Sequence, residues 1–252
     1  MPRPGQPQFR HLSFYSVFVI NRHRDGDVAI IEIDRHERRN ALDAAHCDAL
    51  REAITGAAAR AIVITGAGSS FCSGADLGTV YDTSFRDALY AMLAAVTDTG
   101  VPVLAAVNGP AIGAGAQLAI ACDLRVAARE ATFAIPTVRL GIAVDQWTIR
   151  RLALLAGVGT AQAILIGAQR LDADRAMQCG LASRLGDHAA ALGWARELAG
   201  LAPLSLAYAK KAVNHPDDPS LARDLEACWT SDDAAEGQRA RAEQRPPRFR
   251  GK

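Results

Sequence analysis

Two glycine-rich segments carry the residues best suited to chemistry: 71–77 (FCSGADL) and 108–117 (NGPAIGAGAQ). Each follows an apolar run, 61–65 or 103–107, that predicts a buried strand. The second segment runs directly into a small-residue stretch, 113–121, that predicts a helix. A glycine turn at a helix start leaves backbone N–H groups without intrahelical partners, so both segments can direct donors at one carbonyl oxygen. Such donors stabilise developing negative charge on that oxygen, and the sequence therefore predicts a site built around an activated carbonyl.

The order of these and other short motifs resembles the crotonase, or enoyl-CoA hydratase/isomerase, superfamily. The motifs are RNAL at 39–42, GAGSSFCSGADL at 66–77, NGPAIGAG at 108–115, GI at 141–142, and matching residues within 171–182 and 231–237. They extend over residues 28–252. The pattern is most similar to actinobacterial members that lack both catalytic glutamates, which also carry a glutamine in the second segment, an Asp-x-Trp-[Ser/Thr]-Ile-Arg-Arg-Leu run and an Arg-Pro-Pro-x-Phe terminus.

The elements needed to position these segments follow from periodicity. Residues around Asp25-Gly26, between runs at 16–21 and 28–33, predict a β-hairpin. Strands at 61–65, 103–107 and 124–127 alternate with helices near 43–58, 84–97 and 113–121, which is typical of an α/β fold. Further helices are predicted near 148–156, 160–166, 172–179, 189–200, 203–213 and 220–243.

The resemblance implies a crotonase-like ββα spiral core with a C-terminal helical trimerisation region. We expect residues 1–13 to be a disordered N-terminal extension and 14–195 to form the core. Residues 196–252 are expected to complete the CoA site and the oligomer interface. The implied assembly is a homotrimer or a dimer of trimers.

The resemblance also implies a ligand and the residues that hold it. The backbone N–H groups of Ala75 and Ala114 would form an oxyanion hole for the thioester carbonyl of an acyl-CoA. Ala114 replaces the more usual glycine and lacks its freedom at positive φ. No cofactor is bound permanently, since coenzyme A enters as part of the thioester ligand.

Further residues would contact the CoA moiety by the same resemblance. The implied contacts with adenine and pantetheine are Arg39, Asn40, Ala41, Ser73, Asp76 and Leu77, with Phe249 and Lys252 closing over the nucleotide from the tail. Candidates for the phosphates are Arg38, Arg39, Arg248, Arg250 and Lys252, with a solvated surface charge as the alternative for Arg248 and Arg250. Asp76 has a second interpretation as the N-cap of a following helix.

The two glutamates of a family hydratase activate water and deliver a proton to the α-carbon. The family pattern places these positions at Gln117 and Thr137. An amide does not exchange protons near neutral pH, and a hydroxyl is too weak an acid to act unaided. Ordinary hydration by that pair is therefore not expected.

Asp145 is a lone carboxylate near the predicted acyl end. One branch of the superfamily, the chlorobenzoyl-CoA dehalogenases, uses an aspartate there as its nucleophile, but Tyr90 and Thr137 occupy the positions of that branch's histidine and tryptophan. Asp145 also directly precedes a predicted helix and suits its N-cap, the interpretation we favour.

Composition excludes several other classes. The 252 residues include 28 basic and 27 acidic side chains, which gives no electrostatic case for nucleic acid or an anionic membrane. No apolar run approaches the roughly 20 residues that a membrane span needs. Five cysteines without a Cys-x-x-Cys pair, and six dispersed histidines, favour reduced thiols in the cytoplasm and no metal site.

The function we expect is fatty acyl-CoA or enoyl-CoA binding without standard hydratase activity, as a carrier in fatty acid or lipid metabolism. The resemblance adds fatty acid synthesis enzymes as partners. The alternative is an active lyase or isomerase that uses Asp145 or a water as acid and base. A purely structural oligomer is disfavoured because the CoA-contact motifs are present.

Overall fold

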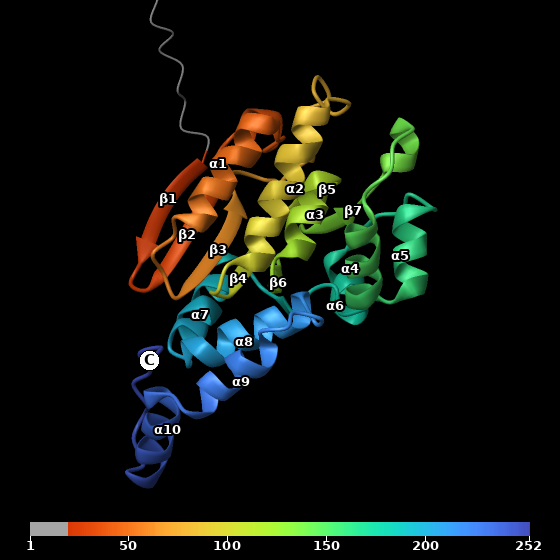
Figure 1. The fold of residues 1–252 in the computed structure, drawn as a ribbon. Helices are drawn as coiled ribbons and strands as arrows, with labels where there is room; N and C mark the ends of the chain where they lie inside the picture. Colours follow the sequence, from red (N-terminus) through yellow and green to blue (C-terminus); the bar gives the residue numbers. More distant parts are fainter. Residues whose placement is uncertain (1–19) are drawn as a thin grey trace, which may run out of the picture.

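The computed structural model describes residues 20–252 and contains a central six-stranded sheet (Figure 1). Its order is β1-β2-β3-β4-β6-β9, parallel except for the antiparallel β1–β2 pair. The strands are β1 Ile20–Asp25, β2 Val28–Ile33, β3 Ala61–Gly66, β4 Val103–Val107, β6 Leu124–Ala127 and β9 Arg184–Leu185. Strands β3 and β4 are buried along their whole length, which explains their continuous apolar runs.

The predicted hairpin is present between β1 and β2. Asp25 pairs with Val28, and Gly26 adopts a positive φ of 58° in the turn. Residues 16–19, where the first strand was expected to begin, and the predicted disordered segment 1–13 lie outside the described residues.

Helices cover both faces of the sheet. Helices α1 (Ala44–Thr55) and α2 (Thr83–Asp98) pack on one face, against side chains such as Ile62 and Ile64 of β3. Helix α7 (His188–Ala199) packs its alanines on the other face, where Val63 of the same strand lies. Alternate residues of β3 therefore belong to two different cores, as the twofold period of a strand requires.

A smaller sheet begins within the second glycine-rich segment, and a single bridge from Cys72 to Ala111 connects the first segment to it. It has the order β5-β7-β8, with β5 Pro110–Ile112, β7 Thr132–Ala134 and β8 Leu171–Asp172. Strand β5 leads directly into helix α3 (Ala114–Ala121), which is buried along its whole length. The remaining helices of this half are α4 Gln146–Ala156, α5 Val158–Leu165 and α6 Ala173–Gln178.

The C-terminal part of the chain is helical and extends away from the sheet as an arm (Figure 1). It contains α8 (Pro203–Asn214), α9 (Leu221–Trp229) and α10 (Asp232–Ala242). The single helix expected over 220–243 was wrong, because Ser231 leaves helical geometry and its side chain caps α10 by accepting the N–H of Ala234.

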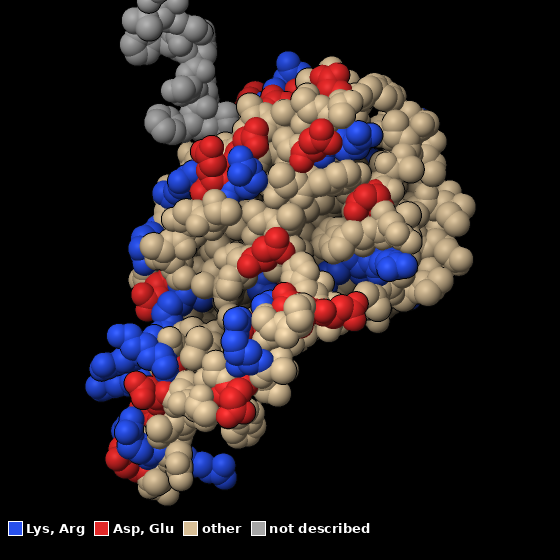
Figure 2. Space-filling model, in the orientation of Figure 1, with Lys and Arg blue, Asp and Glu red and all other residues tan. Residues whose placement is uncertain are grey.

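These observations confirm the α/β class and the helical C-terminal region. Acidic and basic side chains are intermixed on the face in Figure 2, including over the C-terminal arm. Within residues 20–252, no helix combines the length and the apolar character needed to cross a bilayer.

Candidate functional site

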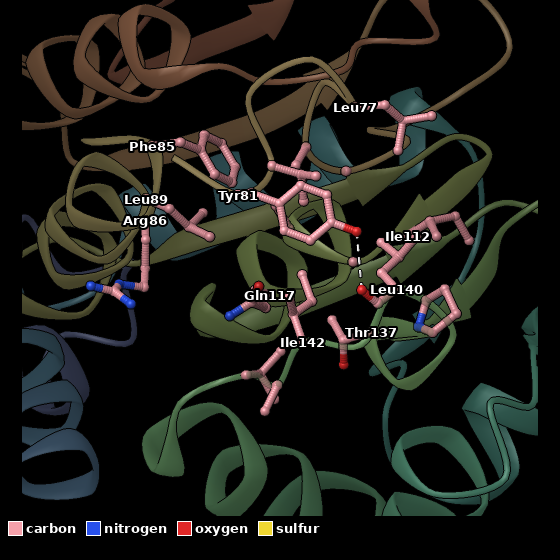
Figure 3. Close-up of a pocket in the computed structure, with 18 of the residues that line it drawn as sticks. Leu77, Tyr81, Phe85, Arg86, Leu89, Ile112, Gln117, Thr137, Leu140 and Ile142 are labelled. Carbon is pink, nitrogen blue, oxygen red and sulfur yellow. Dashed lines mark hydrogen bonds between the residues drawn. The ribbon is translucent and has the colours of Figure 1, made fainter. Parts of the chain in front are cut away.

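A cavity of about 580 Å³ opens where the chain leaves the carboxyl ends of β3 and β4. Its walls come from three stretches, within 73–90, 112–117 and 136–144. Most lining side chains are apolar, among them Phe85, Leu89 and Ile142 (Figure 3). The fold thus brings both glycine-rich segments to one apolar chamber, as the sequence predicted.

Backbone pairing holds the two glycine-rich segments against each other. The Cys72 N–H donates to the Pro110 carbonyl at 3.1 Å, and the Ile112 N–H donates to the Cys72 carbonyl at 2.9 Å. A Cβ at Gly74 would lie 2.7 Å from the Ile112 carbonyl oxygen and 3.6 Å from the Ala114 nitrogen. Glycine is therefore required for this approach, which places Ala75 beside the start of α3.

The N–H groups of Ala75 and Ala114 are the two candidate donors, and both residues line the cavity. In the part of the chain that the structure describes, neither N–H donates a hydrogen bond to another protein group. Ala114 is the first residue of α3, where an N–H has no intrahelical acceptor. The positive φ of this turn falls on Gly113, at 54°, and Ala114 is not among the positive-φ residues, so alanine fits without strain.

The other end of α3 is stabilised by two arginines that sequence reasoning missed. Arg125 is 2% exposed and donates to the carbonyls of Leu181 at 2.5 Å and Cys122 at 2.7 Å, while Arg151 donates to the Ile120 carbonyl at 3.1 Å. Burial lowers the pKa of Arg125 to about 10, so its guanidinium stays charged at neutral pH. Positive charge at a helix C-terminus stabilises the helix dipole, whose positive end here faces the cavity.

The two residues at the expected glutamate positions both line the cavity. Gln117 lies one turn beyond Ala114 on α3 and is 4% exposed. Thr137 begins the short 3-10 helix Thr137–Leu140, which forms another part of the wall. Among the described residues that line the cavity, Asp82 supplies the one carboxylate. It is exposed, lies just before α2 and belongs to no motif that marked it as a catalytic group.

Asp145 lies behind this cavity and does not line it. Its carboxylate accepts the N–H groups of Trp147 at 3.1 Å and Thr148 at 3.4 Å, which makes it the N-cap of α4. Asp145 lines a separate cavity of about 280 Å³, together with Tyr90 and Trp147. Burial raises the pKa of the Tyr90 hydroxyl, and the Asp145 carboxylate adds to this effect. The favoured N-cap interpretation of Asp145 is thus confirmed.

Asn40, expected to contact CoA, has its side chain committed to the protein backbone. It is fully buried, accepts the Arg35 N–H at 3.0 Å, and donates to the carbonyls of Ala67 at 2.9 Å and Ser70 at 2.7 Å. These bonds hold the loop that precedes the first glycine-rich segment. The Asn40 side chain therefore supports this loop from within the protein.

Replacing Asn40 by alanine should lower the free energy of unfolding by about 2 kcal/mol, because the buried Ser70 carbonyl and two partly buried backbone groups lose their partner. Urea unfolding followed by circular dichroism measures this loss. Asn214→Ala is the matched control, since that side chain makes one hydrogen bond, to Thr97, at 3.2 Å. Equal losses in the two variants would contradict the role given to Asn40.

Arg39, Ala41, Ser73 and Leu77 lie around the same loop. Arg39 is exposed, with a φ of 52°, and its carbonyl accepts the Ser73 N–H at 3.0 Å. Ala41 is 8% exposed, whereas Leu77 is 74% exposed at the cavity.

The helix-cap interpretation of Asp76 was wrong, because the residues after it form turns and not a helix. Its side chain accepts the Gly78 N–H at 3.2 Å and pairs with Arg35 at 3.0 Å. The Gly78 N–H, and then the Arg35 charge, lower the pKa of Asp76. Arg35 belongs to no recognisable motif, so the sequence did not indicate its ion pair with Asp76.

Phe249 and Lys252 do not meet the other site residues within one chain. The Arg60 side chain donates to the Phe249 carbonyl at 2.8 Å, and Arg60 directly precedes β3, at the end of the sheet opposite the cavity. Asp233 of α10 fixes this tail by accepting the N–H groups of Arg250 at 2.6 Å and Gly251 at 2.8 Å. Within one chain the tail thus lies at the end of the sheet opposite the cavity, and its closing over a nucleotide stays a prediction.

Comparison with known proteins agrees with this architecture. Residues 23–252 match the family model described as enoyl-CoA hydratase/isomerase. A protein of Mycobacterium leprae named probable enoyl-CoA hydratase echA6 is 45% identical over 239 residues, covering 89% of this chain and 96% of the relative. The protein of the same name from Mycobacterium tuberculosis is 46% identical over 235 residues, with the same coverage of both chains. Among solved structures, a putative enoyl-CoA hydratase from Streptomyces coelicolor A3(2) is 30% identical and covers 99% of this chain and 98% of its own, with a TM-score of 0.83.

Proposed function

Because the chain belongs to the enoyl-CoA hydratase/isomerase family, we propose that it binds fatty acyl-CoA thioesters and does not hydrate them by the two-carboxylate route. The N–H groups of Ala75 and Ala114 would donate to the thioester carbonyl. Support for this role is that both face one cavity and that neither has a protein acceptor among residues 20–252. The apolar walls would hold the acyl chain.

The absence of two-carboxylate hydration is proposed because Gln117 and Thr137 carry an amide and a hydroxyl in place of carboxylates. Both line the cavity at the positions that the family pattern assigns to the catalytic glutamates. Neither side chain titrates near neutral pH, so neither can take a proton from water or return one to the α-carbon. General acid and base groups typically contribute about 10²-fold to 10⁴-fold each, and their loss removes most of the expected rate.

Hydration assays test this proposal. Purified protein incubated with crotonyl-CoA and with a long-chain enoyl-CoA should produce no 3-hydroxyacyl-CoA above the buffer rate. An active family hydratase, assayed in parallel, shows that the conditions support the reaction. Robust hydration by this protein would contradict the proposal.

The second candidate function is an isomerase or lyase with another acid and base. Asp145 is already engaged as a helix cap, so its replacement by asparagine, which also caps helices well, should leave acyl-CoA binding within about threefold of wild type. The cavity wall offers Asp82 instead. If a panel of enoyl-CoA esters reveals turnover, comparing Asp82→Asn with Asp145→Asn decides which carboxylate carries it. Turnover abolished by Asp145→Asn, with binding intact, would favour Asp145 as the acid and base.

We further propose that CoA recognition and assembly are linked. The tail that carries Phe249 and Lys252 lies at the end of the sheet opposite the cavity of its own chain. The arm exposes two large apolar side chains, Leu225 at 41% and Trp229 at 75% of their surface. A homotrimer or dimer of trimers would cover such side chains and bring a partner's tail to the cavity. The CoA phosphates would then meet the basic residues of the arm (Figure 2).

A cytoplasmic carrier that delivers acyl-CoA to fatty acid synthesis enzymes is the role we infer. All five cysteines are free thiols, which suits a reducing compartment. Coenzyme A would arrive and leave with the acyl group, with no permanently bound cofactor.

A further inference from the structure

Three side chains form one hydrogen-bonded relay that leads from the cavity wall into the protein: Gln117, Thr148 and Asp145. The Gln117 Nε2 donates to the Thr148 Oγ1 at 2.9 Å, and this hydroxyl donates to the Asp145 Oδ1 at 2.5 Å. Gln117 is 4% exposed and Thr148 is fully buried. The relay joins α3, which begins at the candidate oxyanion donors, to the start of α4.

The chemistry of these groups fixes the direction of both hydrogen bonds. A carboxylate only accepts, and that of Asp145 also accepts two backbone N–H groups, from Trp147 and Thr148. The threonine hydroxyl has a single proton, which goes to Asp145, so its oxygen can only accept from Gln117. The NH₂ group of the Gln117 amide must therefore face Thr148, and the Oε1 oxygen must face away from it.

The Oε1 atom of the Gln117 amide is then the end that faces the cavity. Gln117 is among the residues that line it, and Figure 3 shows its side chain between Phe85 and Ile142. Across residues 20–252, no protein group donates to the Gln117 Oε1. Gln117 lies three residues beyond Ala114 on one helix, where side chains are neighbours at about 5–6 Å. The cavity thus offers a hydrogen-bond acceptor one helical turn from the carbonyl-binding donors.

We propose that Thr148 and Asp145 are positioning residues that hold Gln117 as a hydrogen-bond acceptor, so that the site selects acyl thioesters with a hydroxyl within two carbons of the thioester carbonyl. A hydroxyl can donate to the Gln117 Oε1. A keto group at the same carbon is an acceptor and would oppose it. This selectivity rests on the proposed acyl-CoA binding.

Calorimetric binding of three ligands of equal chain length tests the inference: an acyl-CoA, its 3-hydroxy derivative and its 3-oxo derivative. Wild type should bind a hydroxy derivative about fivefold more tightly than the unsubstituted ester, and the oxo derivative most weakly. Thr148→Val removes the hydroxyl at nearly constant volume, frees the amide to turn, and should bring the hydroxy-to-oxo affinity ratio close to one. Thr148→Ser should restore the preference, because it restores the hydroxyl.

Two further variants guard against an indirect effect. Gln117→Met keeps the side-chain length without the amide and should also lose the preference, which covers the case in which Thr148→Val does not fold. Thr55→Val is the matched control, since Thr55 is exposed at the end of α1 and its hydroxyl donates to the Arg51 carbonyl at 2.9 Å. Its affinity ratio should equal that of wild type.

The outcomes separate this inference from the function it rests on. Equal wild-type affinities for the three ligands, tighter binding of the oxo derivative, or an unchanged ratio in both Thr148→Val and Gln117→Met would overturn the selectivity and leave acyl-CoA binding standing. Failure of wild type to bind any of the three would overturn both.

Discussion

The variant Ala114→Pro is expected to bind acyl-CoA at least about tenfold more weakly than wild type while remaining folded. Ala114 is the first residue of α3, a position where proline's fixed φ and missing N–H are both tolerated. The exchange therefore removes one candidate oxyanion donor, and the proline ring fills the space in front of it. Calorimetric titration with a long-chain acyl-CoA measures the loss.

Ala114→Gly is the matched control for this experiment. Glycine keeps the N–H and is the residue more usual at this position in the family, so binding should stay within about threefold of wild type, with a small helix-propensity cost. Circular dichroism establishes that both variants are folded. A folded Ala114→Pro protein that binds acyl-CoA as tightly as wild type would exclude the Ala114 N–H from the site.

The variant Gly115→Ala is expected to lower the free energy of unfolding by more than about 3 kcal/mol, and many molecules should fail to fold. A Cβ at this position would lie 2.1 Å from the Cys72 carbonyl oxygen and 2.8 Å from the Cys72 Cβ. Both atoms are held by the pairing between the two glycine-rich segments, so neither can move without separating them. Urea unfolding of the purified variant gives the magnitude.

Gly193→Ala provides the comparison. Gly193 lies within α7, and a Cβ there would meet no atom within 4 Å. Alanine should stabilise this helix by about 0.5–1 kcal/mol, because it reduces the entropy of the unfolded chain. A loss below about 1 kcal/mol in Gly115→Ala, measured beside this control, would mean that the two segments are not locked together as described.

Local patterns predicted the parts of the fold that depend on near neighbours. The apolar runs of β3 and β4, the hairpin at Gly26 and the N-cap at Asp145 are each encoded within a few residues, and each is present. The meeting of the two glycine-rich segments was also predicted, because the loops after neighbouring parallel strands emerge at one edge of a sheet.

Features that depend on distant partners were not predictable in the same way. Asn40 looked like a ligand contact, but its acceptors are carbonyls 27 and 30 residues away, which no motif reveals. Arg125 lies in a short strand, and its burial against the end of α3 follows from the tertiary packing. The tail around Phe249 could not be placed, because the contact with Arg60 spans 189 residues.

The orientation of Gln117 is a further case of information that the sequence alone does not contain. The sequence showed that Gln117 replaces a carboxylate. Which end of its amide faces the cavity is set by the hydrogen bond to Thr148, 31 residues later. The chemical character of the cavity wall therefore depends on a pair of helices meeting, and not on the glycine-rich motif itself.

One measurement tests the central claim most directly: binding and conversion followed in the same samples. Purified protein is titrated calorimetrically with short-chain and long-chain enoyl-CoA esters, and each sample is then analysed by mass spectrometry. The account predicts saturable binding of the long-chain esters, with every ester recovered at its original mass. Recovery of esters that have gained one water, at a rate that scales with protein concentration, would contradict it.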